Sequence, residues 1–144
     1  MTGQEMWAEF SQKQGISAEY DCWSFGDDAD TLAQLVLHDS KTATCSLQCL
    51  YEAEGEPLPR EGQYSVVLDS QDQAICILQT TKVYQTPFSE ITSDHARKEG
   101  EGDRSLAYWR RVHEAFFTEE LKEAGIAFRE DLMLVCEEFR RVYP

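Results

Sequence analysis

A lysine and a threonine stand three residues apart in the stretch from Lys41 to Thr44. A lysine at the junction of a helix and a strand can be partly desolvated, which lowers its pKa and allows it to act as a base. In a regular strand these two side chains point to opposite faces, so they converge only where the strand begins with a bulge or a bend. The simpler interpretation is a solvated lysine at a strand edge, followed by ordinary strand-forming threonines.

The most unusual segment reads Glu-Gly-Glu-Gly-Asp-Arg and runs from Glu99 to Arg104. Its two glycines permit positive φ angles and let a ligand approach the backbone closely. Arg104 stands where a helix is expected to begin, and the helix dipole disfavours a cation there. A residue placed against its local preference indicates some other constraint on this loop. The alternative is a solvated acidic turn in which Asp103 only caps the following helix.

Aromatic side chains gather in two places. Trp23 and Phe25 lie in one short segment, and Trp109 and His113 share a face of a predicted helix. Such rings can stack on a nucleobase, although aromatic residues more often belong to the core, and His113 has the alternative role of a hydrogen-bonded core histidine. The histidines are scattered and no zinc-binding or nucleotide-binding loop motif is present, so we expect neither a metal site nor a cofactor.

Periodicity, capping residues and glycine or proline breaks predict the elements that position these side chains. Thr2 and Glu5 form a capping box at the start of a helix that Gly15 ends. Further helices are expected over 28–38, 93–98 and 104–123, with strands over 41–51, 64–69, 74–84 and 132–143. This order predicts one α+β domain over residues 1–144, in which mostly antiparallel strands curl into a small β-barrel with flanking helices.

The composition limits the partners of this chain. Its 144 residues include 27 acidic and 13 basic side chains, for a net charge of −14. Such a charge repels duplex DNA and anionic membranes, whereas a local basic group can still bind one nucleotide. The longest apolar runs are far shorter than a membrane span. The five cysteines are odd in number and contain no CxxC pair, which favours reduced thiols in a cytoplasmic protein.

Five stretches, taken in order, resemble the ASCH domain family and in particular its YhfF-like subgroup. They are Tyr20-x-x-Trp23-Ser24-Phe25-Gly26-Asp27, Lys41-Thr42-Ala43-Thr44, Glu56-Pro57-Leu58-Pro59-x-x-Gly62, Glu99 through Leu106 with Trp109, and His113-x-x-Phe116-Phe117. Each stretch is weak by itself, but together they span nearly the whole chain. The resemblance implies a PUA-like fold, that is, a small β-barrel with helices around a cleft, and a role in RNA-related biology.

The resemblance also implies a set of catalytic residues. In small amidohydrolases of this family, which remove the acyl group from N4-acetylcytidine, a Lys-Thr-x-Thr segment supplies a lysine and a threonine, and a His-Ala-x-x-Glu segment supplies a glutamate. These fall here on Lys41, Thr44 and Glu99. The implied mechanism has Thr44 as the nucleophile, a neutral Lys41 as its base, and Glu99 either positioning Lys41 or protonating the departing amine. Those enzymes lack the Gly-Glu-Gly-Asp-Arg-Ser continuation that follows Glu99 here.

The same hypothesis implies how the ligand is bound. The expected substrate-binding residues are Trp23, Phe25, Thr42, Glu101, Asp103, Arg104, Trp109 and His113. We expect a small nucleoside or modified base as the ligand. The alternative is a noncatalytic RNA- or nucleotide-binding module, and one type of ASCH protein is described as a ribonuclease. The net charge argues against broad RNA binding but permits recognition of a single splayed-out base.

Overall fold

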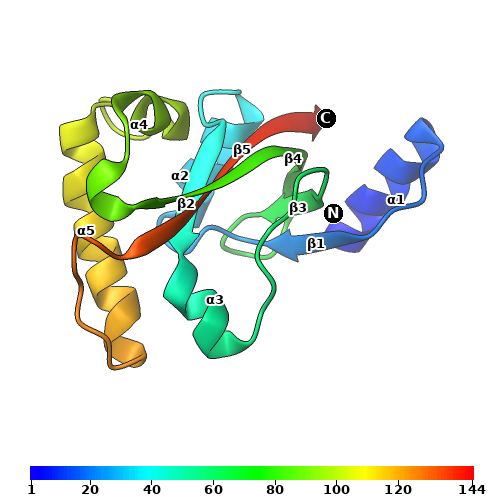
Figure 1. Ribbon diagram of the computed structural model, residues 1–144. Helices are drawn as coiled ribbons and strands as arrows, with labels where there is room; N and C mark the ends of the chain where they lie inside the picture. Colours follow the sequence, from blue (N-terminus) through cyan, green and yellow to red (C-terminus); the bar gives the residue numbers. More distant parts are fainter.

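The computed structural model describes all 144 residues and has an α+β architecture (Figure 1). The strands are β1 (Tyr20–Trp23), β2 (Ala43–Leu47), β3 (Tyr64–Leu68), β4 (Ala74–Pro87) and β5 (Met133–Tyr143). The helices are α1 (Gly3–Gln14), α2 (Ala29–Leu37), α3 (Gln48–Glu54), α4 (Ser93–Glu99) and α5 (Leu106–Glu123), with a short 3-10 helix, η1 (Phe88–Glu90), after β4. None of these helices combines the length and apolarity that crossing a bilayer requires.

The five strands form one open sheet in the order β1-β3-β4-β5-β2. β1 pairs with β3 in parallel, whereas every other neighbouring pair is antiparallel. The expected closed barrel is therefore wrong, because β1 and β2 are the two edges of the sheet and do not pair. The long strands β4 and β5 shift register at Ile77/Leu78 and at Thr80/Lys82. In a closed barrel the two edge strands would be hydrogen-bonded to each other. Here residues of both edge strands line a pocket instead.

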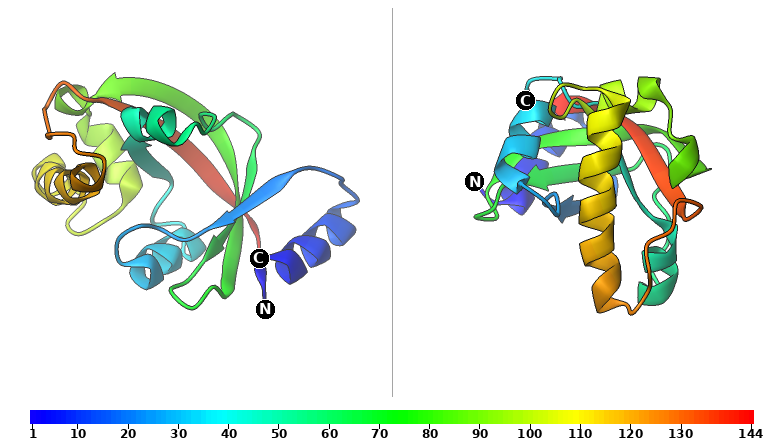
Figure 2. Two further views of the ribbon diagram at one scale, coloured as in Figure 1. Left: turned by 90° about the horizontal axis from the view of Figure 1, so that it is seen from below. Right: turned by 90° about the vertical axis from the view of Figure 1, so that its left-hand side faces the viewer.

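Helices cover both faces of the sheet rather than one side (Figure 2). On one face, α1 packs against Val66 of β3 and Ile77 of β4. On the other face, α2 packs against the neighbouring Val67 and Cys76. Successive residues of a strand point to opposite faces, so one short stretch of β3 anchors both helices. α4 and α5 form a third apolar cluster around Trp109, against β2 and the first half of β5.

Most predicted elements are present with small shifts at their ends. The capping box of α1 is formed, and Gly15 follows the helix in a left-handed conformation with a φ of 65°. The strand predicted over 41–51 is wrong beyond Leu47, because α3 begins at Gln48. Good helix formers over 50–54 and a left-handed Gly55 outweigh the alternating pattern that suggested a strand.

Two further segments differ from the prediction. The aromatic segment 20–26 contains β1, whose parallel partner β3 lies far along the chain and therefore leaves no hairpin signal in the sequence. α5 begins at Leu106, because Ser105 caps it and accepts a hydrogen bond from the Tyr108 amide (3.1 Å). Asp103 is not the cap, and Arg104 lies before the helix with a φ of 66°.

Candidate functional site

Two segments far apart in the sequence meet where α4 ends and β2 begins. The Thr42 amide donates to the Lys98 carbonyl at 2.7 Å. Gly100 permits this close approach, because a Cβ atom there would lie 2.1 Å from the Ser40 carbonyl oxygen, and because its φ is +75°. The junction brings the lysine that precedes β2 and the glutamate that ends α4 into one buried cluster.

The Glu99 carboxylate lies at the centre of this cluster and is surrounded by four nitrogen atoms. Its Oε1 atom lies 3.2 Å from Lys41 Nζ and 3.4 Å from His113 Nε2. Its Oε2 atom lies 2.7 Å from His95 Nε2 and 2.7 Å from Trp109 Nε1. A carboxylate only accepts hydrogen bonds, so Lys41, His95 and Trp109 are donors to it. The contact with His113 is an ion-pair contact. Both oxygens of Glu99 are thus fully engaged by the protein itself.

The Lys41 ammonium is buried between two carboxylates. Its Nζ atom lies 2.8 Å from Glu101 Oε2 and 3.2 Å from Glu99 Oε1, and 5.4 Å from the centre of the Phe25 ring. Burial lowers the pKa of Lys41, but the attraction of Glu99 and Glu101 outweighs burial, so the pKa is raised. The arrangement favours a charged Lys41 over the neutral base that the resemblance implies, because the loop after α4 supplies a second counter-charge.

The same charges determine the protonation of the neighbouring groups. Burial alone would raise the pKa of Glu99. Lys41 and His113 lower this pKa by more than burial raises it, so it lies well below its usual value. Burial lowers the pKa of His113, but the Glu99 carboxylate outweighs burial and raises it. Burial and the charge of Glu99 raise the pKa of the Cys45 thiol well above its ordinary value. A thiol that stays protonated is a poor nucleophile, which argues against Cys45 as the reactive group.

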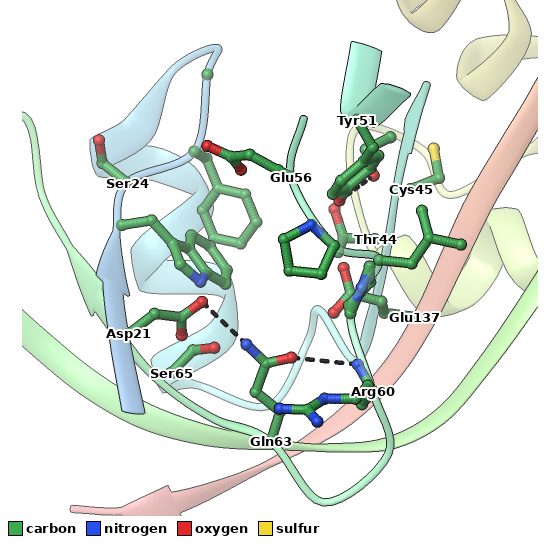
Figure 3. Close-up of a pocket in the computed structure, with 17 residues that line it drawn as sticks. Asp21, Ser24, Thr44, Cys45, Tyr51, Glu56, Arg60, Gln63, Ser65 and Glu137 are labelled. Atoms are coloured by element: carbon green, nitrogen blue, oxygen red, sulfur yellow. Dashed lines mark hydrogen bonds between the residues drawn. The ribbon is translucent and has the colours of Figure 1, made fainter. Parts of the chain in front are cut away.

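A pocket of about 400 Å³ opens beside this cluster, between the two edge strands (Figure 3). Its volume lies within the range of small-molecule sites, about 300–1,000 Å³. Asp21 and Gln63 lie on one side of the pocket, and Thr44, Tyr51 and Glu137 lie on the other. The pocket therefore offers polar groups on two opposing walls.

A smaller cavity of about 80 Å³ shares four lining residues with the pocket, namely Phe25, Gly26, Thr44 and Cys45. Lys41 and Glu99 also line this cavity. The structure thus brings the three predicted catalytic residues around one space. The Lys41 ammonium, however, bonds to carboxylates and not to the Thr44 hydroxyl.

Four of the predicted binding residues line one of these two spaces. Trp23 and Phe25 line the pocket, with their rings edge to face and 5.0 Å apart. Glu101 and His113 line the smaller cavity. The aromatic pair is therefore placed to cover a planar ligand in the pocket.

The other four predicted binding residues line neither space: Thr42, Asp103, Arg104 and Trp109. Asp103 accepts from the Ser105 amide at 2.9 Å. The Arg104 guanidinium donates to the Arg97 carbonyl at 3.2 Å. The Thr42 amide bonds to the Lys98 carbonyl next to the buried cluster, and Trp109 Nε1 donates to Glu99 within it. The unusual loop therefore uses its polar groups to hold its own shape and to supply Glu101.

Two carboxyl groups of the pocket were missed by the sequence analysis. Glu137 lies directly opposite Thr44 in the pairing of β2 with β5. Burial and the nearby charge of Asp21 raise the pKa of Glu137 to about 7, against a smaller lowering by the Thr80 hydrogen bond. In Asp21, Oδ2 accepts from Gln63 at 3.2 Å, whereas Oδ1 is buried without a partner. The only sequence signal was a glutamate directly after an apolar run, and nothing in the sequence linked it to Asp21.

Cys45, Glu99 and His113 place three atoms of metal-ligand type within 4.8 Å of one another. The Lys41 ammonium already lies 3.2 Å from one of these atoms, Glu99 Oε1. A divalent cation would be repelled by this charge and would need the Cys45 thiol to lose its proton against a raised pKa. These residues therefore fit a metal ion poorly.

The comparisons with known proteins agree with one another. The family model described as ASCH domain matches residues 21–143. An ASCH domain from Lactobacillus crispatus JV V101 is 35% identical, with a TM-score of 0.91 over 98% of this chain and 94% of that chain. A protein from Enterococcus faecalis V583 is 38% identical, with a TM-score of 0.91 over 97% of this chain and 87% of that chain. A variant ASCH protein from Zymomonas mobilis, 10% identical, has a TM-score of 0.53 over 87% of this chain and 76% of that chain, which shows likeness of fold alone. No curated protein sequence matches this chain.

Proposed function

This chain belongs to the ASCH domain family, and from that membership we propose that it hydrolyses the amide bond of an acylated nucleoside such as N4-acetylcytidine. In this proposal the base occupies the pocket under Trp23 and Phe25. The Thr44 hydroxyl attacks the acyl carbon, and the ammonium of Lys41 faces the oxygen that becomes negative. The size of the pocket and its aromatic lining support a ligand of this kind.

The observation that carries this proposal is the position of Thr44, which lines both the open pocket and the small cavity beside the buried cation. Amide hydrolysis needs a nucleophile on the carbonyl carbon and a positive group near the carbonyl oxygen. An acyl group that extends from a base in the pocket toward Thr44 would meet both requirements at one point.

The charge of Lys41 assigns it a role other than that of a base. Its raised pKa keeps it an ammonium at neutral pH, and Glu99 and Glu101 fix its position. A fixed ammonium stabilises a tetrahedral oxyanion because it needs no reorganisation during the reaction. Glu99 is ionised and already surrounded by donors, so it has no proton for the departing amine. We therefore assign Glu99 the positioning of Lys41.

Incubation of the pure protein with N4-acetylcytidine, followed by chromatographic separation of cytidine, tests this proposal. We expect cytidine to accumulate with the wild-type protein and not with Thr44→Val, which has no hydroxyl but nearly the same shape. Thr42→Val is the matched control, because Thr42 lines neither the pocket nor the smaller cavity. Unchanged N4-acetylcytidine after prolonged incubation, together with no heat of binding in calorimetry, would reject the proposal.

A second candidate function is recognition of a single modified base without catalysis. It is favoured by the donors around Glu99 and by the charge of Lys41, which leave neither residue free to transfer a proton. Under this alternative, calorimetry detects binding of N4-acetylcytidine, and the ligand is recovered unchanged. The same two measurements therefore separate the two candidates.

A further inference from the structure

In the hydrolysis proposed above, Lys41 is bound by two carboxylates and Glu99 is surrounded by donors, so the proton of Thr44 needs another acceptor. Glu137 lies directly opposite Thr44 in the antiparallel ladder between β2 and β5. Directly opposed residues point to the same face of a sheet, with Cβ atoms about 4.5–5.5 Å apart. Both residues line the pocket, and Figure 3 shows them on the same side of it. A carboxyl group is thus placed beside the proposed nucleophile.

The carboxyl group of Glu137 has few competing interactions. Its hydrogen bond within the protein comes from the Thr80 hydroxyl at the long distance of 3.4 Å. The neighbouring ion pairs with Lys82 and Lys98 are formed by Glu138 instead. The titratable or charged residues that line the pocket around it are Asp21 from β1, Cys45 from β2, Tyr51 from α3, and Glu56 and Arg60 from the following loop. Of these, Asp21 opposes its charge and helps to raise its pKa to about 7. A base works best when its pKa lies near the working pH.

We propose that Glu137 is the general base of this site, an assignment that rests on the proposed hydrolysis. As Thr44 Oγ1 bonds to the acyl carbon, its proton passes to the Glu137 carboxylate, and the carbonyl electron pair moves to the oxygen. Collapse of this tetrahedral intermediate breaks the carbon–nitrogen bond, and Glu137 returns the proton to the departing amine. Water then attacks the Thr44 ester, with its proton passing to Glu137, and the acid leaves as Thr44 regains its hydroxyl.

Acetylation by p-nitrophenyl acetate tests this assignment independently of nucleoside recognition, since this activated ester needs no base-binding pocket. Released nitrophenolate gives the rate, and peptide mass spectrometry locates the acetyl group. We expect the wild-type protein to be acetylated at Thr44, with a rate that rises with pH through an inflection near 7. Glu137→Gln should slow this step at least about 100-fold and remove the inflection. Thr44→Val measures the background from other side chains.

Two further variants sharpen the test. Glu138→Gln is the matched control, because Glu138 is the next residue of β5, accepts from Lys98 at 3.1 Å, and does not line the pocket. It should react as the wild-type protein does. Asp21→Asn should move the inflection to lower pH, because it removes a negative charge that faces Glu137. A merely structural role of Glu137 would not produce that shift.

The outcomes separate the two proposals. Wild-type rates in Glu137→Gln, or no acetylation of Thr44 in the wild-type protein, would overturn the assignment of Glu137. If Thr44 is acetylated in a Glu137-dependent way while N4-acetylcytidine stays intact, the proposed substrate is wrong and the pairing of Glu137 with Thr44 stands.

Discussion

The surroundings of Glu99, which is buried, and of Glu137, which is partly buried, give these two carboxyl groups opposite properties. Glu99 is met by four nitrogen atoms, and its pKa lies well below the usual value. Glu137 has one long hydrogen bond and faces the charge of Asp21, and its pKa is raised to about 7. In many active sites, two acids with different pKa values have different roles, because one stays ionised while the other exchanges a proton. Here the first acid positions a cation, and the second is suited to proton transfer.

Replacing Glu99 by glutamine should lower the free energy of unfolding by about 3–5 kcal/mol, because Lys41 would lose a buried counter-charge. Urea unfolding at pH 7 measures this difference. Glu101→Gln is the control and should cost less, since the Glu101 side chain is 17% exposed and pairs with Lys41 alone. Equal stability of Glu99→Gln and the wild-type protein would contradict the central role given to Glu99.

Replacing Glu137 by glutamine should instead stabilise the protein at high pH. The pKa of Glu137 is raised from 4.5 to about 7, so the wild-type protein loses stability as the pH rises between these values, where the unfolded chain releases the proton first. Glutamine has no such proton, and the variant should gain up to about 3 kcal/mol above pH 7 and nothing near pH 4. Thermal unfolding across this pH range measures the gain, and a pH-independent difference would count against the buried carboxyl described here.

At the scale of elements, the site depends on how α4 meets the start of β2. Gly100 follows α4 with a left-handed φ of +75°, and its Cα lies against the backbone of Ser40. The turn places Glu99 and Glu101 on either side of Lys41. A short helix, one glycine and an acidic loop therefore set the charge of a lysine that belongs to another element.

Gly100→Ala tests this junction. A Cβ atom would lie 2.1 Å from the Ser40 carbonyl oxygen, and the backbone there cannot move without displacing the Lys41 segment. We expect a loss of about 3–5 kcal/mol from the positive φ and the clash together.

Gly55→Ala is the matched control for this change, because its φ is +67° and nothing lies within 4 Å of the added atom. It should cost only about 1–2 kcal/mol. Urea unfolding compares the two variants, and similar losses would show that the close approach at Gly100 is unimportant.

The molecule that contains this pocket carries a net charge of −14. Three acids and one arginine line the pocket itself: Asp21, Glu56, Glu137 and Arg60. A long polyanion is repelled by such a surface, whereas a neutral nucleoside is not. The charge distribution therefore favours a small ligand over a nucleic-acid chain.

Salt dependence tests this preference. Binding of cytidine, measured by calorimetry, should change less than about twofold between 50 and 500 mM salt, because no phosphate contacts are made. A single-stranded RNA should bind weakly or not at all under the same conditions. Tight RNA binding that weakens steeply with added salt would instead support the RNA-binding alternative.

Features that depend on neighbouring residues could be predicted from the sequence. The capping box of Thr2 and Glu5, the helices around 29–37 and 93–99, and the hairpin of β3 and β4 follow from local periodicity and turn residues. The motif stretches also identified the family, and they led to Lys41, Thr44 and Glu99, which line one cavity.

The chemical behaviour of those residues depends on contacts between distant parts of the chain and could not be predicted from the sequence. The parallel pairing of β1, the open sheet and the pocket between its edges join segments from distant parts of the chain. The pKa values of Lys41 and Glu137 depend on which charges lie within a few ångströms and on how much water is excluded. Spacing along a chain carries no such information, because charges and burial act through space. The sequence therefore indicated where the chemistry lies, whereas the fold places two carboxylates against the lysine and a second acid opposite the threonine.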